Sequence, residues 1–532
     1  MSSNFKKILL ILLLGTIEFL NAQRNVILII ADDLGTNYLG FYEDYKDTVD
    51  VPNIRRLAHN GVRFENAASN PVCSSTRSGV LTGRYSFRTG VGGVVGGVGG
   101  SNPLDTAENT IPRMLKIFNP NIANANIGKW HLQQPMPASN LKFPNVMGYD
   151  HFEGPFIGQL PSYTNWTKYT NGTSSNVTTY ATTENVNNAI GWLKNQNGKP
   201  FFLWLAFNAP HEPLHLPPTE LHSYKNLSGT TQDIRTNPTS YFKAMMQAMD
   251  HEIGRLFDSL QVMGRLDSTD IIFIGDNGSS QKTAQITDTA RAKGTVYQNG
   301  IHVPFIIAGP SVKDPGRTSN ALVNTTDIFA SVLELFGFMD WRSHIALNKP
   351  VDSKSILPVI KEESNEVRPW SFSEIFASTP DPQDGKCIRN LDYKLIKFNT
   401  GREEFYKLLN DPEEKNNLLQ LKMNPDDISN YYYLCNEMEK LLGSGNICLS
   451  SVDAKDIYPN ISTTFVYPNP FKSKIKLNTM SGSTMYELYN FMGVKIFSGK
   501  DIENQDFSTL QTGTYLLKTY DETCQLFKLI KE

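Results

Sequence analysis

Four short apolar runs set the strongest limit on how this chain can fold. Each is a nearly unbroken apolar stretch of strand length, the kind that a parallel sheet with both faces covered requires. They are Val26–Ala31, Phe201–Phe207, Asp270–Ile274 and Val303–Ala308. Helical patterns lie between them, for example from Tyr241 to Leu260. Strands that alternate with helices predict a doubly wound α/β sheet, with a ligand site at the carboxyl ends of its strands.

Length and composition fit this expectation. The 532 residues leave room for a large core and more than one domain. A net charge of -3 with 19% charged residues predicts no nucleic-acid partner, so an anionic substrate must meet a local cluster of charge. The five cysteines are too few and too scattered for a disulfide framework or a zinc site, although Cys435 and Cys448 could pair in an exported protein.

The amino terminus predicts export. Lys6 and Lys7 precede the apolar run from Ile8 to Leu20, and small residues follow as far as Ala22. This is the pattern of a signal peptide over residues 1–22, with passage through the periplasm. The alternative is a buried N-terminal helix, which is less favoured because a strand pattern begins at once with Asn25.

Acidic pairs follow two of the predicted strands. Asp32 and Asp33 come directly after the first run, and Asp276 and Asn277 come after the third. Carboxylates next to buried strands are costly unless a cation or hydrogen bonds compensate them. Oxygen ligands suit calcium or magnesium rather than zinc. For either pair alone, a turn-forming role is the alternative.

The run from Pro71 to Arg84 contains a cysteine in an unusual setting. Its sequence is Pro-Val-Cys-Ser-Ser-Thr-Arg-Ser-Gly-Val-Leu-Thr-Gly-Arg. Proline followed by short hydroxyl residues predicts a helix start, which would place Cys73 at a helix N-terminus where an anion is favoured. Arg77, four residues on, would share a helix face with Cys73. The alternative is a buried structural cysteine beside a surface arginine.

The cysteine run closed by Leu-Thr-Gly-Arg resembles the maturation signature of the formylglycine-dependent sulfatases. Further motifs resemble that family in the same order, over residues 24 to about 420. They are Ala-Asp-Asp-Leu-Gly from Ala31, Gly-Lys-Trp-His-Leu from Gly128, Pro-His-Glu-Pro from Pro210, Gly-Asp-Asn-Gly from Gly275, and the segment Lys293–Pro304. Strand alternation would put Lys129 and His131 on one face.

The resemblance implies an alkaline phosphatase-like fold with a large, mixed but mostly parallel sheet between helices. The catalytic domain would span residues 23–385, and a small antiparallel α+β subdomain would span 386–450. It also implies one calcium ion, with magnesium as the second choice, and conversion of Cys73 to 3-oxoalanine (formylglycine) by a maturase. The implied metal ligands are Asp32, Asp33, Cys73, Asp276 and Asn277.

The resemblance assigns catalytic roles to six residues. The hydrate of matured residue 73 attacks the sulfur, and its second hydroxyl later expels sulfate. Arg77 and Lys129 would stabilise that hydrate, Lys293 and His131 would bind the sulfate, and His211 would protonate the departing oxygen. The chain departs from the family pattern at Ser75, where proline is usual, and at His302, where arginine is usual.

The insert from about Pro155 to Thr183 contains Tyr163, Trp166 and Tyr169 among many polar residues. Two interpretations stand: a lip on which sugars stack, or a polar surface loop.

Short alternating segments after about Thr463 predict a small all-β module. The start Tyr467-Pro468-Asn469-Pro470 and the later Gly513-Thr514-Tyr515 resemble the C-terminal sorting domain of type IX secretion in Bacteroidetes. That domain would span residues 463–532 after a linker at 451–462, and it implies the type IX machinery as a partner and a secreted or cell-surface location. A carbohydrate-binding β-sandwich is the alternative.

Together these features predict an exported sulfatase acting on a sulfated carbohydrate, such as an algal polysaccharide or its oligosaccharides. One alternative is a phosphatase, phosphodiesterase or phosphonate monoester hydrolase on the same fold. The other is an inactive surface protein that binds glycans.

Overall fold

The computed structural model describes residues 24–42, 47–97, 99–443, 466–477, 485–490, 494–520 and 524–532. The predicted signal peptide and the predicted linker at 451–462 lie outside these residues. The described residues form two compact units, of which the first contains a ten-stranded sheet and the second contains the C-terminal strands β15 to β20. No helix in the described part combines the length and apolar character needed to cross a lipid bilayer.

The ten-stranded sheet has the order β10-β2-β9-β8-β1-β7-β3-β4-β5-β6. Its strands are β1 (Asn25–Ala31), β2 (Gly61–Ala68), β3 (Ala123–Gly128), β4 (His151–Gly154), β5 (Trp166–Thr170), β6 (Thr173–Val177), β7 (Phe201–Ala206), β8 (Thr269–Gly275), β9 (Phe305–Ala308) and β10 (Arg317–Asn324). The central strand β1 pairs in parallel with both β7 and β8. The predicted mixed, mostly parallel sheet is confirmed.

One strand runs in an unexpected direction. The run ending at Ala308 forms β9, which is antiparallel to β2 and to β8. All four residues of β9 are buried. An apolar run indicates that a strand is covered on both faces of the sheet. This holds for a buried antiparallel strand as much as for a parallel one, so the run does not predict direction.

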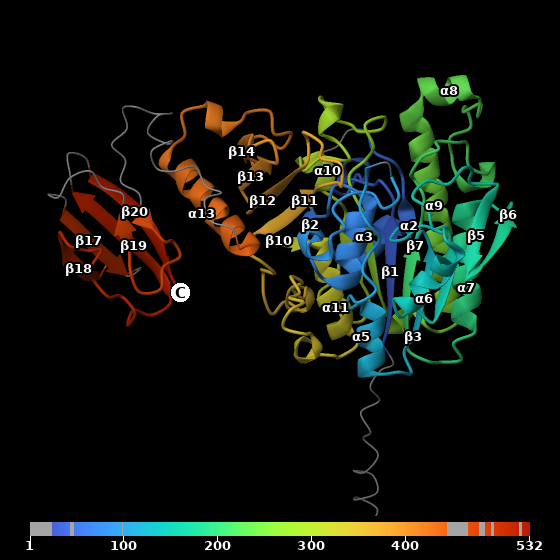
Figure 1. Ribbon diagram of the computed structural model, residues 1–532, viewed down its shortest axis with the longest axis horizontal. Coiled ribbons are helices and arrows are strands. Elements are labelled where there is room, and N and C mark those ends of the chain that lie inside the picture. Colours follow the sequence, from blue (N-terminus) through green and yellow to red (C-terminus); the bar gives the residue numbers. More distant parts are fainter. Residues whose placement is uncertain are drawn as a thin grey trace, which may run out of the picture. The chain divides into compact units, whose positions relative to one another are not determined.

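Helices cover both faces of the sheet, and the side chains of β1 alternate between the two cores. Val26, Leu28 and Ile30 pack with α3 (Cys73–Thr82), α5 (Ile111–Phe118), α11 (Ile328–Leu335) and α12 (Leu357–Ile360). Ile27 and Ile29 pack with α2 (Pro52–His59), α7 (Ala181–Lys194) and α9 (Pro238–Val262). In Figure 1, α3 lies over β1 and β7 lies beside it. The shorter helices are α4 (Ser86–Thr89), α6 (Phe143–Val146), α8 (Thr231–Thr236) and α10 (Gln298–Ile301).

A smaller sheet has the order β11-β12-β13-β14, and β11 and β12 pair antiparallel. Its strands are β11 (Ser371–Ile375), β12 (Gly385–Arg389), β13 (Tyr393–Phe398) and β14 (Glu403–Lys407), and α13 (Pro425–Leu442) follows. Cys435 on α13 is disulfide-bonded. Cys448, its proposed partner, lies outside the described residues.

The C-terminal module is all-β, as the sequence predicts, and the described strands pair antiparallel. One sheet has the order β18-β17-β19-β20 and a second pairs β15 with β16. Its strands are β15 (Val466–Tyr467), β16 (Lys476–Leu477), β17 (Met485–Asn490), β18 (Lys495–Gly499), β19 (Gly513–Tyr520) and β20 (Cys524–Lys531). A separate apolar core that includes Phe471, Leu488 and Leu517 holds the module together.

Candidate active site and metal centre

The carboxyl ends of β1 and β8 bring the two acidic pairs together. Ala31 is in register with Gly275, so the residues that follow them leave the sheet side by side. The amide of Asp33 donates to Oδ1 of Asp276 at 3.1 Å, and Nδ2 of Asn277 donates to Oδ1 of Asp33 at 2.8 Å. These residues and Asp32 are buried.

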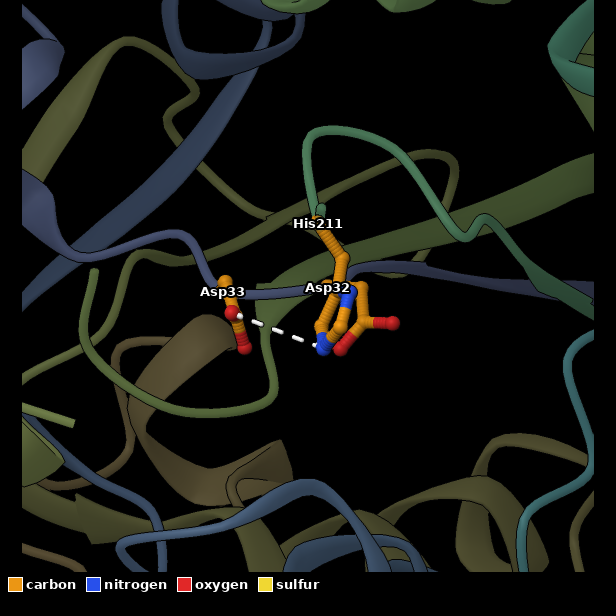
Figure 2. A group of neighbouring side chains, drawn as sticks. All are labelled: Asp32, Asp33 and His211. Carbon is orange, nitrogen blue, oxygen red and sulfur yellow. Dashed lines mark ion pairs between the residues drawn. The ribbon is translucent and has the colours of Figure 1, made fainter. Parts of the chain in front are cut away.

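The donor set fits a hard divalent cation. Oδ1 of Asp32 and Oδ1 of Asn277 are buried and have no hydrogen-bond partner among the described residues. Buried polar atoms are normally paired, so two orphaned oxygens in one acidic cluster call for a cation. Asp32, Cys73 and Asp276 each offer an atom within 4.8 Å of the others, as do Asp32, Asp33 and His211. Figure 2 shows Asp32, Asp33 and the His211 ring facing one another.

Three basic side chains balance the three carboxylates. Lys129 pairs with Asp32, Lys293 with Asp33, and Arg77 with Asp276. Burial would raise the pKa of Asp32, but Lys129, His211 and Arg77 outweigh it and hold that pKa below its usual value. Burial and the charge of Asp32 raise the pKa of Asp276. The cluster therefore holds opposite charges at close range, and its three carboxylates are shielded from solvent.

Arg77 is buried and pairs with the acidic cluster. Its Nε and one terminal nitrogen donate to Oδ2 of Asp276 at 3.1 and 2.8 Å, and the other terminal nitrogen donates to the Lys129 carbonyl at 2.9 Å. The side chain is fully buried. In this structure the guanidinium holds an acidic side chain of the cluster in place.

Cys73 is the first residue of α3, as predicted. Its side chain is buried, and Sγ lies 3.2 Å from Nδ1 of His131. Burial raises the pKa of the Cys73 thiol, although Lys129 and Lys293 oppose this. Burial and the neighbouring Lys129 and Arg77 lower the pKa of His131 well below its usual value. A neutral thiol therefore faces a neutral imidazole.

The helix begins where the sequence predicts, but the hydroxyl residues after Cys73 do not cap it. The hydroxyl of Ser74 donates to the His131 carbonyl at 2.9 Å and accepts from the Val95 amide at 3.0 Å. The hydroxyl of Ser75 donates to the Val72 carbonyl at 2.9 Å. Ser74 thus fastens the start of the helix to the loop that carries His131.

Lys129 and His131 do not lie in a strand, so alternation does not place them. β3 ends at Gly128, whose φ of +101° and close approach to the Ala206 carbonyl leave no room for a Cβ atom. The amide of Lys129 donates to that carbonyl at 2.8 Å. His131 itself has a φ of 60°, a left-handed conformation rare outside glycine. A turn presents both side chains to the acidic cluster.

His211 follows β7 and points one ring nitrogen toward the acidic cluster. Nδ1 lies 2.7 Å from the Glu212 carbonyl, which can only accept, so Nδ1 carries the hydrogen. Nε2 lies 3.8 Å from Oδ2 of Asp33, the contact dashed in Figure 2. Burial lowers the pKa of His211, and Asp33 and Asp32 oppose that shift.

Three residues noted in the sequence lie outside the cluster. His302 contacts the Glu65 carbonyl through Nε2 at 2.7 Å and the Thr36 hydroxyl through Nδ1 at 3.2 Å. In the insert, Tyr163 and Trp166 are 3% and 1% exposed, so neither can serve as a sugar-stacking lip. Tyr163 instead contacts the His211 turn, a role that the sequence did not reveal because the two segments are distant in the chain.

Family models match three parts of the chain. A sulfatase model matches residues 24–338, more than half of the 532 residues. The chain belongs to the sulfatase family. The model "N-sulphoglucosamine sulphohydrolase, C-terminal" matches residues 291–441, and "Secretion system C-terminal sorting domain" matches residues 465–532. The predicted family and sorting domain are both confirmed, and that domain implies type IX secretion to the surface or exterior.

Curated relatives share about a quarter of their residues with this sulfatase-family chain. Arylsulfatase J of Mus musculus is 27% identical over 336 residues, 59% of this chain and 52% of that protein. The ulvan-active sulfatase of Formosa agariphila is 26% identical over 432 residues, 75% of this chain and 77% of that protein. The chain thus spans about half the length of the first of these relatives.

A solved structure confirms the fold. Ps i-CgsB, crystallised with k-i-k-neocarrahexaose, superposes with a TM-score of 0.66 at 23% identity, covering 82% of this chain and 97% of that one. At this identity the likeness concerns the fold.

Proposed function

We propose that this protein is an exported sulfatase that hydrolyses sulfate esters of a sulfated carbohydrate. The observation that carries the proposal is the buried cluster in which Asp32, Cys73 and Asp276 lie within ligand distance of one another, surrounded by basic side chains. A sulfate ester gains negative charge on its oxygens as the bond to the alcohol breaks, so a site with converging positive groups stabilises its transition state.

Asp32, Asp33, Asp276 and Asn277 would hold one calcium ion, together with the matured residue 73. When bound, the ion supplies a fixed positive charge that binds a sulfate oxygen and orients residue 73. Calcium is preferred to magnesium because four carboxylate or amide side chains converge on the site, whereas magnesium usually keeps several waters.

Residue 73 would act as the nucleophile after its oxidation to formylglycine, which supplies a hydrated aldehyde with two hydroxyls. Its place at the start of α3 directs backbone amides toward an anion. Lys129 and Arg77 would stabilise negative charge on residue 73. His131 lies in contact with the residue 73 side chain and, with Lys293, would bind the sulfate group.

His211 would protonate the departing alcohol oxygen. Its Nδ1 hydrogen is committed to the Glu212 carbonyl, so a proton carried on Nε2 faces the pocket. A sugar alkoxide is a poor leaving group, and an acid positioned to protonate it raises the rate by about 10²- to 10⁴-fold.

The substrate proposed is a sulfated algal polysaccharide or its oligosaccharides. Two observations support this class. The ulvan-active sulfatase covers three quarters of the chain, and the sorting domain directs the protein to the outside, where intact polysaccharides occur. A signal peptide at residues 1–22, the type IX machinery and a maturase complete the proposed partners.

The test is sulfate release by the full chain co-expressed with a maturase. Peptide mass should show formylglycine at residue 73, and ion chromatography should detect sulfate released from ulvan, carrageenan or their oligosaccharides. Cys73→Ala should be folded and inactive. Faster turnover of 4-nitrophenyl phosphate than of 4-nitrophenyl sulfate would favour a phosphatase or phosphodiesterase. Glycan binding without sulfate release would favour an inactive surface protein.

A further inference from the structure

One short segment contacts both loops that carry the active-site histidines. Residues 155–163 form most of the connection from β4 to β5. The amides of Trp130 and His131 donate to the Pro155 and Phe156 carbonyls, each at 3.0 Å. A Cβ atom on Gly158 would lie 2.4 Å from Cε1 of His131, so the backbone of this segment lies directly against the imidazole.

The far end of the segment reaches the His211 turn through Tyr163. Its hydroxyl lies 2.8 Å from the Asn208 carbonyl and 2.8 Å from the His211 carbonyl. The His211 amide in turn donates to the Asn208 carbonyl at 2.9 Å. The hydroxyl therefore shares its one hydrogen between the two carbonyls that begin and end the turn, and it fixes their separation.

The Tyr163 ring is itself held in place. It packs against the His215 ring at a tilt of 32°, with ring centroids 4.2 Å apart. Burial lowers the pKa of His215 to about 4, so this imidazole is neutral near pH 7. Nδ1 of His215 then donates to the Pro213 carbonyl at 2.8 Å, and Nε2 accepts from the Tyr180 hydroxyl at 3.1 Å.

We propose that Tyr163 is a positioning residue: its hydroxyl fixes the Asn208–His211 turn and thereby directs Nε2 of His211 toward the oxygen that leaves during sulfate hydrolysis. The inference rests on the proposed function, in which His211 is the acid. Tyr163 donates no proton to substrate in this account, because both of its contacts are backbone carbonyls. Its effect must therefore appear as a dependence on the leaving group.

Tyr163→Phe removes the hydroxyl and keeps the ring that packs against His215. Matured wild type and variant are compared on 4-nitrophenyl sulfate, on phenyl sulfate and on sulfated ulvan oligosaccharides. The nitrophenolate leaves without protonation, so its kcat should change less than about twofold. For the phenyl and sugar esters kcat should fall about tenfold or more at a similar KM, because a misplaced acid loses part of its effect. In His211→Ala, kcat should also fall least on 4-nitrophenyl sulfate and more on the phenyl and sugar esters. The loss should be larger than in Tyr163→Phe.

Tyr42→Phe is the matched control. Its hydroxyl is also buried and also bonds backbone groups, those of Phe305 at 3.2 and 2.9 Å. Tyr42→Phe should lower stability about as much as Tyr163→Phe does, and it should leave the ratio of kcat between the substrates unchanged. If kcat of Tyr163→Phe falls equally on every substrate, or does not fall at all, the proposal is wrong.

A crystal structure of Tyr163→Phe separates this inference from the proposed function. The turn and the His211 ring should move while Asp32, Asp33 and Asp276 stay in place. An unmoved His211 ring rules out positioning by Tyr163, whatever the activity. If the matured wild type has no sulfatase activity, the proposed function itself is wrong. The turn then has no role in sulfate hydrolysis.

Discussion

The sulfur of Cys73 lies 3.2 Å from Nδ1 of His131, although 58 residues separate them in the chain. The contact depends on two local features: α3 begins at Cys73, and His131 adopts a left-handed φ of 60° directly after β3. Ser74 links the same two loops through the His131 carbonyl. Backbone geometry as well as side chains thus holds residue 73, the proposed nucleophile, next to His131.

Unconverted Cys73 should react slowly in the folded protein. The side chain is 2% exposed, and burial raises the pKa of its thiol, so little of the reactive thiolate is present near neutral pH. We expect iodoacetamide to modify Cys73 at least about tenfold more slowly in the native chain than in urea. Peptide mass at residue 73 measures this rate, and an exposed cysteine introduced as Thr173→Cys reports the ordinary rate in the same sample. Equal rates at both positions would contradict the prediction.

The burial of α3 predicts that residue 73 is converted before the chain folds. All residues of α3 are buried, so a maturase cannot bind this segment as an extended peptide after folding. Added maturase should convert residue 73 in chains diluted from urea and leave folded chains unconverted. Conversion of the folded chain at a similar rate would show that α3 opens readily.

Ser75→Pro should fold. Ser75 lies in the first turn of α3, where backbone amides have no partner within the helix and proline is tolerated. The variant loses the hydrogen bond to Val72, so the free energy of unfolding should fall by about 1 to 2 kcal/mol. Urea unfolding measures this change. Ser78→Pro, in the interior of the same helix, should cost about 3 kcal/mol or more.

Ser75→Pro should also raise the fraction of formylglycine at residue 73 when a foreign maturase is used, because proline is the residue usual at this place in the family. Peptide mass measures that fraction. An unchanged fraction would show that the maturase does not distinguish serine from proline here.

Calcium should stabilise the protein independently of activity. A ligand that binds only the folded state adds about 2.7 kcal/mol when its concentration is 100 times its Kd. Calcium added to chelator-treated protein should therefore raise Tm, and Asp276→Asn should abolish most of that rise. Asp250→Asn is the control, because this buried aspartate on α9 bonds the amides of Asn53 and Ile54, outside the cluster. It should lower Tm and retain the calcium effect; an equal calcium effect in Asp276→Asn would exclude Asp276 as a ligand.

Much of the fold follows from local sequence. Burial on both faces leaves apolar runs such as those of β1 and β7, and acidic pairs directly after such strands mark the edge where a site forms. Strand direction could not be predicted from the sequence, because the antiparallel strand β9 has the same apolar pattern as the parallel strands of the sheet. Direction depends on how the chain returns to the sheet, which composition does not record.

The site was predictable as a set of residues and less so as a set of contacts. The residues expected to bind metal do converge on one cluster. The turn that presents Lys129 and His131 requires a left-handed histidine, which no local preference indicates. The pairing of Arg77 with Asp276 and the contact of Tyr163 with the His211 turn depend on the long-range arrangement of the sheet.

Glu374→Gln should change how stability depends on pH. Glu374 on β11 is buried and accepts a hydrogen bond from the Phe87 amide at 2.7 Å. Burial raises its pKa to about 7 from 4.5. Between these values the folded chain keeps a proton that the unfolded chain has lost, so this group lowers stability as pH rises. Glutamine cannot ionise, so the wild type should lose roughly 2 kcal/mol relative to the variant between pH 5 and pH 8.

Urea unfolding of both proteins at pH 5 and pH 8 measures that difference. Glu363→Gln, at an exposed position, is the control and should follow the wild type at both pH values. If the stabilities of Glu374→Gln and wild type differ by the same amount at both pH values, Glu374 is ionised throughout. The positive charges of Lys386 and Arg88 would then have to keep this carboxylate ionised against the opposing charge of Asp352.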